Sequence, residues 1–184
     1  MLPFAAVPSV RRYVPAAVAA AATLAIAAPA TAIAGGCANA DANPNHVSAS
    51  VAQRATLCLL NGERRAHHLR RLRENGRLDL ASVRHAEDMA RNNYFAHGNF
   101  VGRIRSAHYL QGARGWTVGE NIAWGSLDWA TPRAIMRSWM NSPPHRANIL
   151  NRSFRDIGIG VARGAPVSGV SNAATYVTDF GARG

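Results

Sequence analysis

Three side chains that can bind a metal or activate water stand in distinctive local settings along the chain. His97 comes just past a predicted helix, Glu120 follows a glycine and precedes an apolar run, and His145 follows a double proline. Neutral imidazoles and a carboxylate are the groups that zinc or a hydrolytic water needs. They are therefore candidates for one shared site. The alternative is that each is a separate structural residue held by hydrogen bonds.

Other chemical motifs are weaker. The sequence contains no phosphate-binding glycine loop, His-Glu-x-x-His zinc motif, Gly-x-Ser-x-Gly elbow or Cys-x-x-Cys pair. A serine nucleophile at Ser142 with His145 as its base is a variant, although no oxyanion-hole motif accompanies the pair. Four further histidines have settings typical of solvated or structural side chains; they are His67, His68, His85 and His108.

The first 34 residues have the features of a secretory signal peptide. Arg11 and Arg12 form a short basic region, residues 16–28 are apolar apart from Thr23, and residues 32–34 fit a small-x-small cleavage pattern. Crossing a bilayer as a helix takes about 20 residues, so this run predicts an exported protein and not a transmembrane one. Two other export routes stay open: a twin-arginine signal at Arg11 and Arg12, and a lipidated Cys37.

The two cysteines of the chain are Cys37 and Cys58. An even pair in an exported chain predicts one disulfide, which would tie an N-terminal arm, residues 35–49, to the first helix. A link that closes a loop of this size stabilises a fold by roughly 3 kcal/mol in the chain-entropy account. No histidine lies at ligand spacing from either cysteine, which makes a metal-binding role the weaker alternative.

The charge of the chain is strongly positive. Without the leader, 19 arginines face 10 acidic residues, a net charge of +9, and the sequence has no lysine. A basic exported protein is attracted to anionic lipid headgroups or acidic wall polymers. Arginine without lysine is equally typical of GC-rich codon usage. Nucleic acid is excluded as a partner, because no basic stripe with interleaved aromatic residues accompanies the export signal.

Apolar periodicity and capping residues predict helices first and strands last. Helices are expected over residues 50–69, residues 80–92 with Asp79 as N-cap, and residues 132–141 with Thr131 as N-cap and Pro132 in the first turn. Residues 94–118 read as mostly loop with at most a short helical turn, and residues 120–125 as a strand or a buried irregular segment. The expected strands are residues 157–162 and 175–180, which gives an α+β fold. One further helical turn is expected after the double proline, over residues 145–150.

Six separated blocks of the chain resemble, in order, the bacterial form of the CAP domain (cysteine-rich secretory protein, antigen 5 and pathogenesis-related 1). They read "LLNGERR", "RHAEDMARNNYFAHGN", "VGENIAWG", "TPRAIMRSWMNSPPHRANIL", "FRDIGIGVA" and "TYVTDFG". The resemblance implies a three-layer α-β-α sandwich with a central antiparallel sheet over residues 50–184, the CAP/SCP fold. It also implies a cleft with two histidines and two acidic residues, where some members bind zinc.

The resemblance assigns positions in that cleft. His97 and His145 match its two histidines, and Glu120 matches its first glutamate, which would be the catalytic candidate. The second glutamate has no acidic counterpart, because Ser142 or Asn141 stands in its place. The cleft therefore keeps three of the four groups expected to bind a metal.

Two further matches lie in the first predicted helix. Asn61 and Arg64 correspond to an Asn and an Arg of the family pattern, and we expect both to bond structurally to neighbouring loops or the sheet.

These observations favour a secreted binding or interaction module that acts on lipid, an anionic cell-wall polymer or an extracellular protein. The missing second acid supports this hypothesis, and the resemblance implies no general reaction. The alternative is a zinc-dependent extracellular hydrolase, a peptidase or a cell-wall-modifying enzyme. In that case His97 and His145 would hold Zn²⁺, and Glu120 would orient or deprotonate water.

Overall fold

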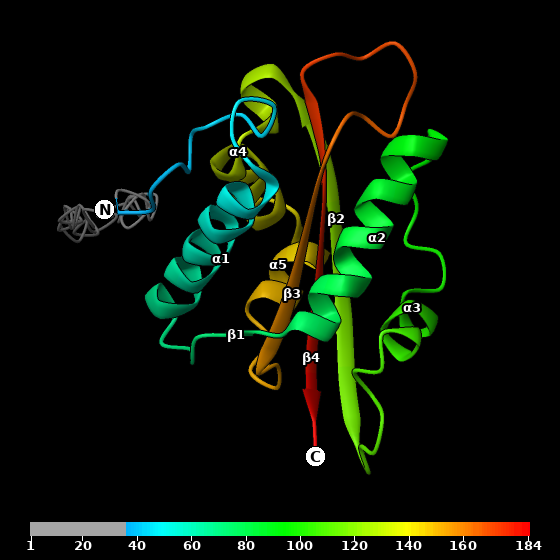
Figure 1. The fold of residues 1–184 in the computed structure, drawn as a ribbon. Coiled ribbons are helices and arrows are strands. Elements are labelled where there is room, and N and C mark those ends of the chain that lie inside the picture. Colours follow the sequence, from blue (N-terminus) through cyan, green and yellow to red (C-terminus); the bar gives the residue numbers. More distant parts are fainter. Residues whose placement is uncertain (1–35) are drawn as a thin grey trace, which may run out of the picture. The chain divides into compact units, whose positions relative to one another are not determined.

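The computed structural model of the protein describes residues 36–184 (Figure 1). The predicted signal peptide, residues 1–34, lies outside the described residues. No helix in the described part of the chain is both long and apolar enough to cross a membrane.

The described chain alternates helices and strands before it ends in a hairpin. The elements are α1 (Ala49–Ala66), β1 (Arg73–Glu74), α2 (Gly76–Asn92), α3 (Phe100–Ser106), β2 (Trp116–Ser126), the 3-10 helix η1 (Leu127–Ala130), α4 (Pro132–Met140), α5 (Pro143–Ile149), β3 (Asp156–Arg163) and β4 (Ala173–Arg183).

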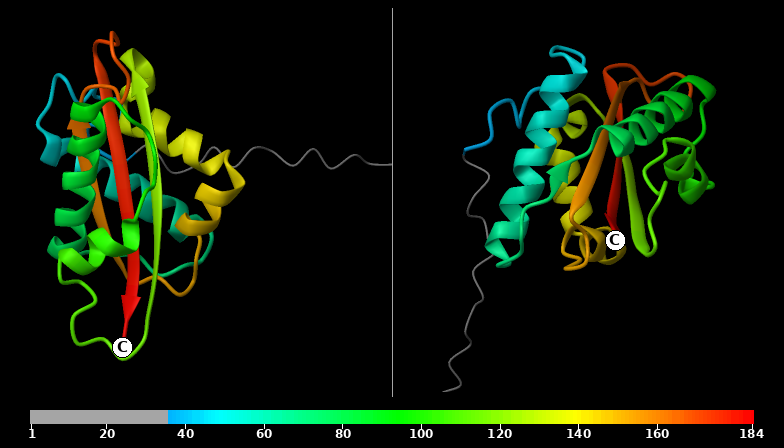
Figure 2. Two further views of the ribbon diagram at one scale, coloured as in Figure 1. Left: turned by 90° about the vertical axis from the view of Figure 1, so that its right-hand side faces the viewer. Right: turned by 60° about the horizontal axis from the view of Figure 1, so that its bottom comes forward.

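One sheet forms the middle layer, with strand order β1-β3-β4-β2. Strand β4 pairs antiparallel with both β3 and β2, and β1 adds two residues parallel to β3. Helices α1, α4 and α5 lie on one face, and α2 and α3 on the other (Figures 1 and 2). The predicted α-β-α sandwich is confirmed, with the short parallel β1 as an addition. Strand β2 is an edge strand along its full length.

Side chains alternate across β4 and feed a core on each face. Tyr176 and Phe180 lie in the core beneath α1 and α4, whereas Val177 packs with Met89 of α2. Helix α2 lies directly on β3 because the strand has glycine at the contact. A Cβ on Gly158 would lie 2.0 Å from the backbone of α2, and one on Gly160 would lie 2.2 Å from it. The sequence "DIGIGVA" is therefore a docking surface for a helix.

Side-chain caps begin helices α1 and α4, and the one at Thr131 was predicted. The Ser48 side chain accepts a hydrogen bond from the backbone N–H of Val51 at the start of α1, and Thr131 does the same for Ala134 at the start of α4. Proline at the first position of α4 needs no hydrogen-bond acceptor for its nitrogen, which reinforces that start.

The predicted cap at Asp79 is wrong. Helix α2 begins earlier, because the Asn75 side chain accepts from the N–H groups of Arg77 and Leu78. The Asp79 carboxylate instead accepts from the backbone N–H of Ile159 at 2.9 Å, which joins α2 to β3. An acid in the first turn of a helix suits either role, and the sheet contact decides between them.

Residues 94–118 contain more regular structure than expected. Helix α3 occupies Phe100–Ser106, where Asn99 caps its start through Gly102 N–H. Strand β2 begins at Trp116 and continues to Ser126, so residues 120–125 are the middle of a long strand. Each residue of β2 pairs with a residue of β4, which sets the length of the strand. Because this pairing partner is distant in sequence, the amino-acid pattern of β2 alone does not reveal the full strand.

The predicted disulfide between Cys37 and Cys58 is confirmed. It ties the segment before Ser48 to α1, and within that segment Ala40 is buried in the main core. The arm is thus part of the domain.

Asn61 and Arg64 hold the segment after α1 against the rest of the fold. Asn61 exchanges two hydrogen bonds with the backbone of Leu72, at 2.8 and 3.1 Å. Arg64 is 1% exposed, and its guanidinium donates to the carbonyl oxygens of Arg70, Ile149 and Asn151 at 2.7–3.0 Å. A single buried cation therefore satisfies three backbone acceptors from two loops.

We expect Arg64→Met to lower the free energy of unfolding by about 3 kcal/mol, because three buried carbonyl oxygens lose their donor. The matched control is Arg65→Met on the exposed side of the same helix, with an expected change within about 0.5 kcal/mol. Urea denaturation followed by circular dichroism measures both. Equal losses in the two variants would contradict the role of Arg64.

Candidate functional site

The candidate site lies along the free edge of β2. Glu120 is in the strand itself, His97 is in the loop between α2 and α3, and His145 is in α5. Glu120 faces the side of α2 and α3, whereas α5 lies on the opposite face of the sheet. His145 lies close enough to His97 to respond to its charge. The structure thus brings the three predicted residues into one neighbourhood around a strand edge.

Glu120 is buried, and both of its oxygens are engaged. Its side chain is 1% exposed; Oε1 lies 2.8 Å from His97 Nδ1, and Oε2 lies 2.5 Å from Arg103 Nη2. Because a carboxylate only accepts, His97 Nδ1 carries the proton of that bond. The carboxylate thus fixes the orientation of the imidazole, while the His97 side chain remains 49% exposed.

The loop that carries His97 is held from two sides. Arg103 donates to the carbonyl oxygen of His97 at 2.8 Å, and His85 Nε2 donates to that of Ala96 at 2.9 Å. His85 is 2% exposed, and burial, followed by the charge of Arg103, lowers its pKa. His85 is therefore a neutral anchor for the loop, which agrees with the structural role predicted from its position beside the apolar face of α2.

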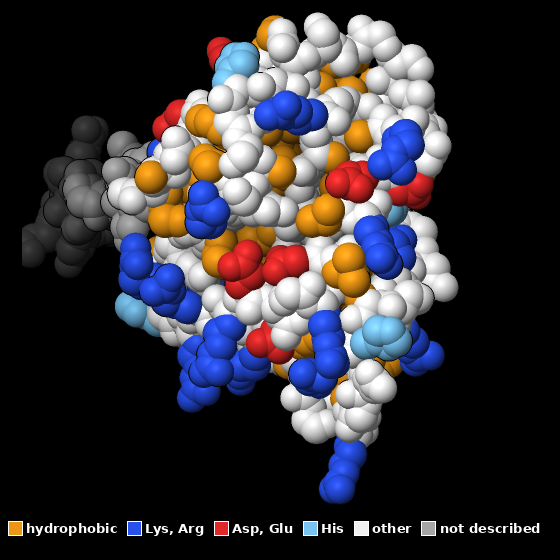
Figure 3. All heavy atoms as spheres, viewed as in Figure 1, with side chains coloured by type: hydrophobic (Ala, Val, Ile, Leu, Met, Phe, Trp, Pro, Cys, Tyr) orange, Lys and Arg blue, Asp and Glu red, His pale blue; other side chains and the backbone are white. Residues whose placement is uncertain are grey.

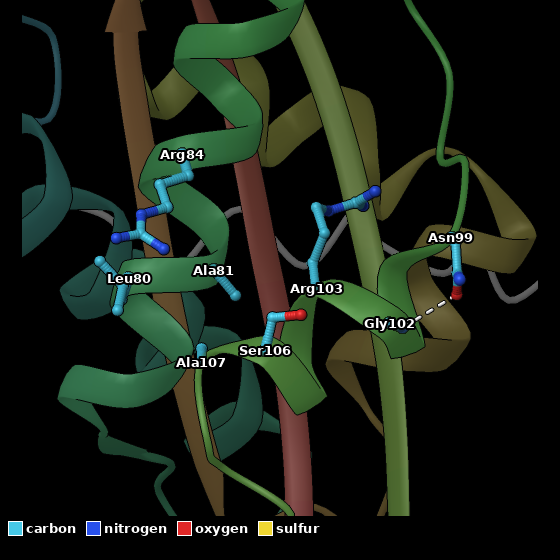
Figure 4. Close-up of a pocket in the computed structure, with 8 residues that line it drawn as sticks. All are labelled: Leu80, Ala81, Arg84, Asn99, Gly102, Arg103, Ser106 and Ala107. Atoms are coloured by element: carbon cyan, nitrogen blue, oxygen red, sulfur yellow. Dashed lines mark hydrogen bonds between the residues drawn. The ribbon is translucent and has the colours of Figure 1, made fainter.

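Arg103 is a functional residue that the sequence did not indicate, because its segment was expected to be loop. Its side chain extends from α3 over β2, and together with Arg84 of α2 it lines a hollow of about 410 Å³ (Figure 4). The signal available in the sequence was indirect: a lone carboxylate in an apolar run needs a cation. Arg103 is 24% exposed and supplies that cation to Glu120.

A second carboxyl group lies behind Glu120. Asp179 of β4 is the direct cross-strand partner of Glu120 and is fully buried. Its Oδ2 accepts from Ser82 at 2.8 Å, whereas Oδ1 has no donor within residues 36–184. Burial, and then the charge of Glu120, raises the pKa of Asp179 to about 8. At neutral pH Asp179 is therefore protonated, and its O–H is available to the Glu120 carboxylate.

His145 is neutral at physiological pH. Burial lowers its pKa, and the neighbouring His97 imidazole lowers it further. Its Nδ1 lies 2.9 Å from the hydroxyl of Ser142, the residue before α5. Within the described chain no acid hydrogen-bonds the imidazole of His145, so the pair lacks the third group of a serine-based catalytic triad. Asn141 is the exposed C-cap of α4, so Ser142 is the one of these two that contacts a cleft histidine.

Two asparagines fix α5 against the edge strand. Asn148 donates to the carbonyl oxygen of Glu120 at 3.1 Å and to the side chain of Asn121 at 2.9 Å. Asn121 in turn donates to the carbonyl oxygen of His145 at 3.0 Å. These bonds satisfy a backbone acceptor that an edge strand leaves unpaired, and they set the position of His145. Neither asparagine was predicted from the sequence as a site residue.

The expected metal set, His97, Glu120 and His145, does not form a three-ligand site. Within residues 36–184 no group of three or more His, Cys, Asp or Glu side chains is arranged to hold a metal ion. The physical reason is that Glu120 already binds His97 and Arg103 with its two oxygens. The other histidines stand apart: His67, His68 and His108 are exposed.

The Asp179 pair predicts a pH dependence of stability. The folded state keeps Asp179 protonated, whereas in the unfolded chain it ionises near pH 4. The folded state then binds more protons, so this contribution is full below about pH 4 and is lost as the pH rises towards 8. The slope is at most about 1.4 kcal/mol per pH unit.

We expect Asp179→Asn to remove this slope, because the amide cannot ionise. Guanidinium denaturation at several pH values between 5 and 8 measures it, and wild-type stability should fall relative to the variant as the pH rises. Asp128→Asn, on the exposed η1, controls for the loss of one acidic side chain. Parallel curves for wild type and Asp179→Asn would show that Asp179 is ionised in the folded protein.

The comparisons with known proteins agree with this geometry. The family model "CAP: Cysteine-rich secretory protein family" matches residues 57–178, which contain His97, Glu120 and His145. The chain is 35% identical to YkwD of Bacillus subtilis over 118 residues, which are 61% of this chain and 43% of YkwD.

Solved structures show the same fold. An extracellular SCP-domain protein from Bacillus anthracis is 27% identical with a TM-score of 0.57, over 72% of this chain and 40% of that one. An outer surface protein from Borrelia burgdorferi has a TM-score of 0.57 at 21% identity, over 70% of this chain and 90% of that one, which is a likeness of fold. The chain spans less than half the length of YkwD and of the Bacillus anthracis protein. By the match over residues 57–178, this chain belongs to the cysteine-rich secretory protein (CAP) family.

Proposed function

We propose that this protein is exported and acts outside the cytoplasm as a binding module, with the cleft around His97 and His145 as its recognition site. The signal-peptide pattern of residues 1–34 and the disulfide between Cys37 and Cys58 support export, because such bonds persist in oxidising compartments. The extracellular SCP-domain protein of Bacillus anthracis supports it by similarity.

The observation that carries the binding proposal is the burial of Glu120. A general base must reach the water or substrate proton that it removes. The Glu120 side chain is 1% exposed, and its two oxygens bind His97 and Arg103. It therefore serves to position His97. The accessible groups of the site are the exposed imidazole of His97 and the partly buried imidazole of His145, which can bond to a ligand without a reaction.

A divalent cation at the two imidazoles is a second proposal, supported by one specific feature. A carboxylate bonded to Nδ1 of a histidine, as Glu120 is to His97, is the arrangement that commonly orients metal-binding imidazoles. The lowered pKa of His145 keeps its ring neutral, as metal binding requires. A bound Zn²⁺ would act as a Lewis acid, and a metal-assisted hydrolase, a peptidase or wall-modifying enzyme, is the alternative function it would permit.

Zinc titration by calorimetry on the purified protein at neutral pH tests the cation. We expect binding in the micromolar range or weaker, because two imidazoles are fewer than the three protein ligands of a typical zinc enzyme. The double variant His97→Ala, His145→Ala should lose this binding. The matched control His67→Ala, His68→Ala removes two exposed histidines and should retain it. Equal affinity in all three proteins, or no zinc binding by the wild type, would contradict a cation site at His97 and His145.

Incubation with cell-wall fragments and peptides in the presence of Zn²⁺, analysed by mass spectrometry, separates the two functions. A binding module co-sediments with its ligand and leaves every mass unchanged. Cleavage products that disappear with His145→Ala would overturn the binding proposal in favour of the hydrolase.

A further inference from the structure

A second surface, remote in the sheet from the cleft, has no role in the function proposed above. It is a groove of about 700 Å³ beside β1, at the sheet edge opposite β2. Its charged lining is Arg70, Arg71, Arg73 and Arg155, and its apolar lining includes Leu57 and Leu72. We call it the arginine groove. Figure 3 shows arginine side chains gathered at the lower left of the molecule, where the C-terminal end of α1 leads towards β1.

The positive charge of the arginine groove is not compensated. None of its four arginines forms a salt bridge with an acid in residues 36–184. The acid next in sequence, Glu74, follows Arg73 in a strand and so points to the opposite face, where its charge acts on Asp79 of α2. The charge of Arg155 also reaches the buried Arg64 and lowers its pKa, after the larger effect of burial.

The backbone under these arginines is held in place, although residues 70–72 lie outside helix and strand. The Arg64 guanidinium donates to the carbonyl oxygen of Arg70 at 2.8 Å. The side-chain amide of Asn61 donates to the carbonyl oxygen of Leu72 and accepts from its backbone N–H. The two sides of the groove are joined by the bond from Arg73 N–H to the carbonyl oxygen of Arg155 at 2.9 Å. The charges are thus presented from a fixed frame, which lowers the entropy lost on binding.

We propose that the arginine groove binds an extended polyanion with repeated phosphodiester groups, such as a poly(alditol phosphate). Guanidinium groups pair with phosphate through two parallel hydrogen bonds, and a row of them suits phosphates at intervals along a chain. Leu57 and Leu72 offer apolar contact to the carbon segments between phosphates.

Two other phosphate-bearing partners fit this surface less well. A membrane surface is favoured by exposed large apolar side chains beside the charge, and those of the described chain, among them Trp129 and Leu127, lie outside the groove. Single-stranded nucleic acid binds through aromatic stacking, and no aromatic residue lines the groove.

Binding of poly(glycerol phosphate) to the purified protein, followed by calorimetry at several salt concentrations, tests the proposal. The variant Arg70→Gln, Arg71→Gln, Arg73→Gln should raise the dissociation constant at least tenfold and flatten the logarithmic salt dependence by about two, because up to three phosphate contacts are lost. The control Arg54→Gln, Arg84→Gln, Arg114→Gln removes the same charge from exposed arginines elsewhere and should change affinity less than about twofold.

Comparisons with other variants and other anionic ligands separate this proposal from its alternatives. Equal weakening by both triple variants would overturn the proposal in favour of net charge alone. Tighter groove-dependent binding to phosphatidylglycerol vesicles or to oligonucleotides would overturn it in favour of a membrane or a nucleic acid. Polymer binding that survives in His97→Ala, His145→Ala assigns the ligand to the groove and leaves the cleft proposal independent, whereas its loss there would place the polymer in the cleft.

Discussion

Two buried carboxyl groups, Glu120 and Asp179, face each other across β2 and β4, and the site is organised by the need to avoid two adjacent charges. One solution is a proton on Asp179, whose pKa burial raises to about 8. The other is that Glu120 accepts hydrogen bonds from the guanidinium of Arg103 and the imidazole of His97. A buried carboxylate satisfied in this way is costly to disturb, because removing any one partner leaves charge or a donor unpaired in a place that water does not reach.

The same strand explains why the segments that carry His97 and His145 approach each other at this place. Strand β2 has no neighbour on its outer side, so its outward carbonyl groups need other donors. Asn148 supplies one to Glu120, and this contact brings α5 and His145 up to the strand from one face while the loop of His97 approaches from the other. The exposed imidazoles therefore follow from how the edge is closed, and their position depends on asparagine and arginine side chains more than on contact with each other.

Local signals in the sequence predicted the elements that local chemistry determines. Thr131 and Pro132 marked the start of α4, and the even cysteine pair predicted the bond between Cys37 and Cys58. Contacts between residues distant in sequence could not be predicted from these local signals. Asn75 and not Asp79 caps α2 because β3 takes the Asp79 carboxylate. The family pattern placed His97, Glu120 and His145 near one another, but it did not reveal Arg103, which donates a hydrogen bond to the Glu120 carboxylate.

The two edges of the sheet solve one problem in different ways, and this difference bears on what each can bind. At the β2 edge, Glu120 neutralises the positive charge of Arg103, and the groups left exposed are imidazoles that suit a small, specific ligand. At the β1 edge, the buried cation Arg64 donates to backbone carbonyl oxygens, and the arginines of the groove form no salt bridge with an acid in residues 36–184. A long polyanion gains from many such charges at once. The two edges of the sheet therefore present different chemistry, with imidazoles at the β2 edge and arginines at the β1 edge.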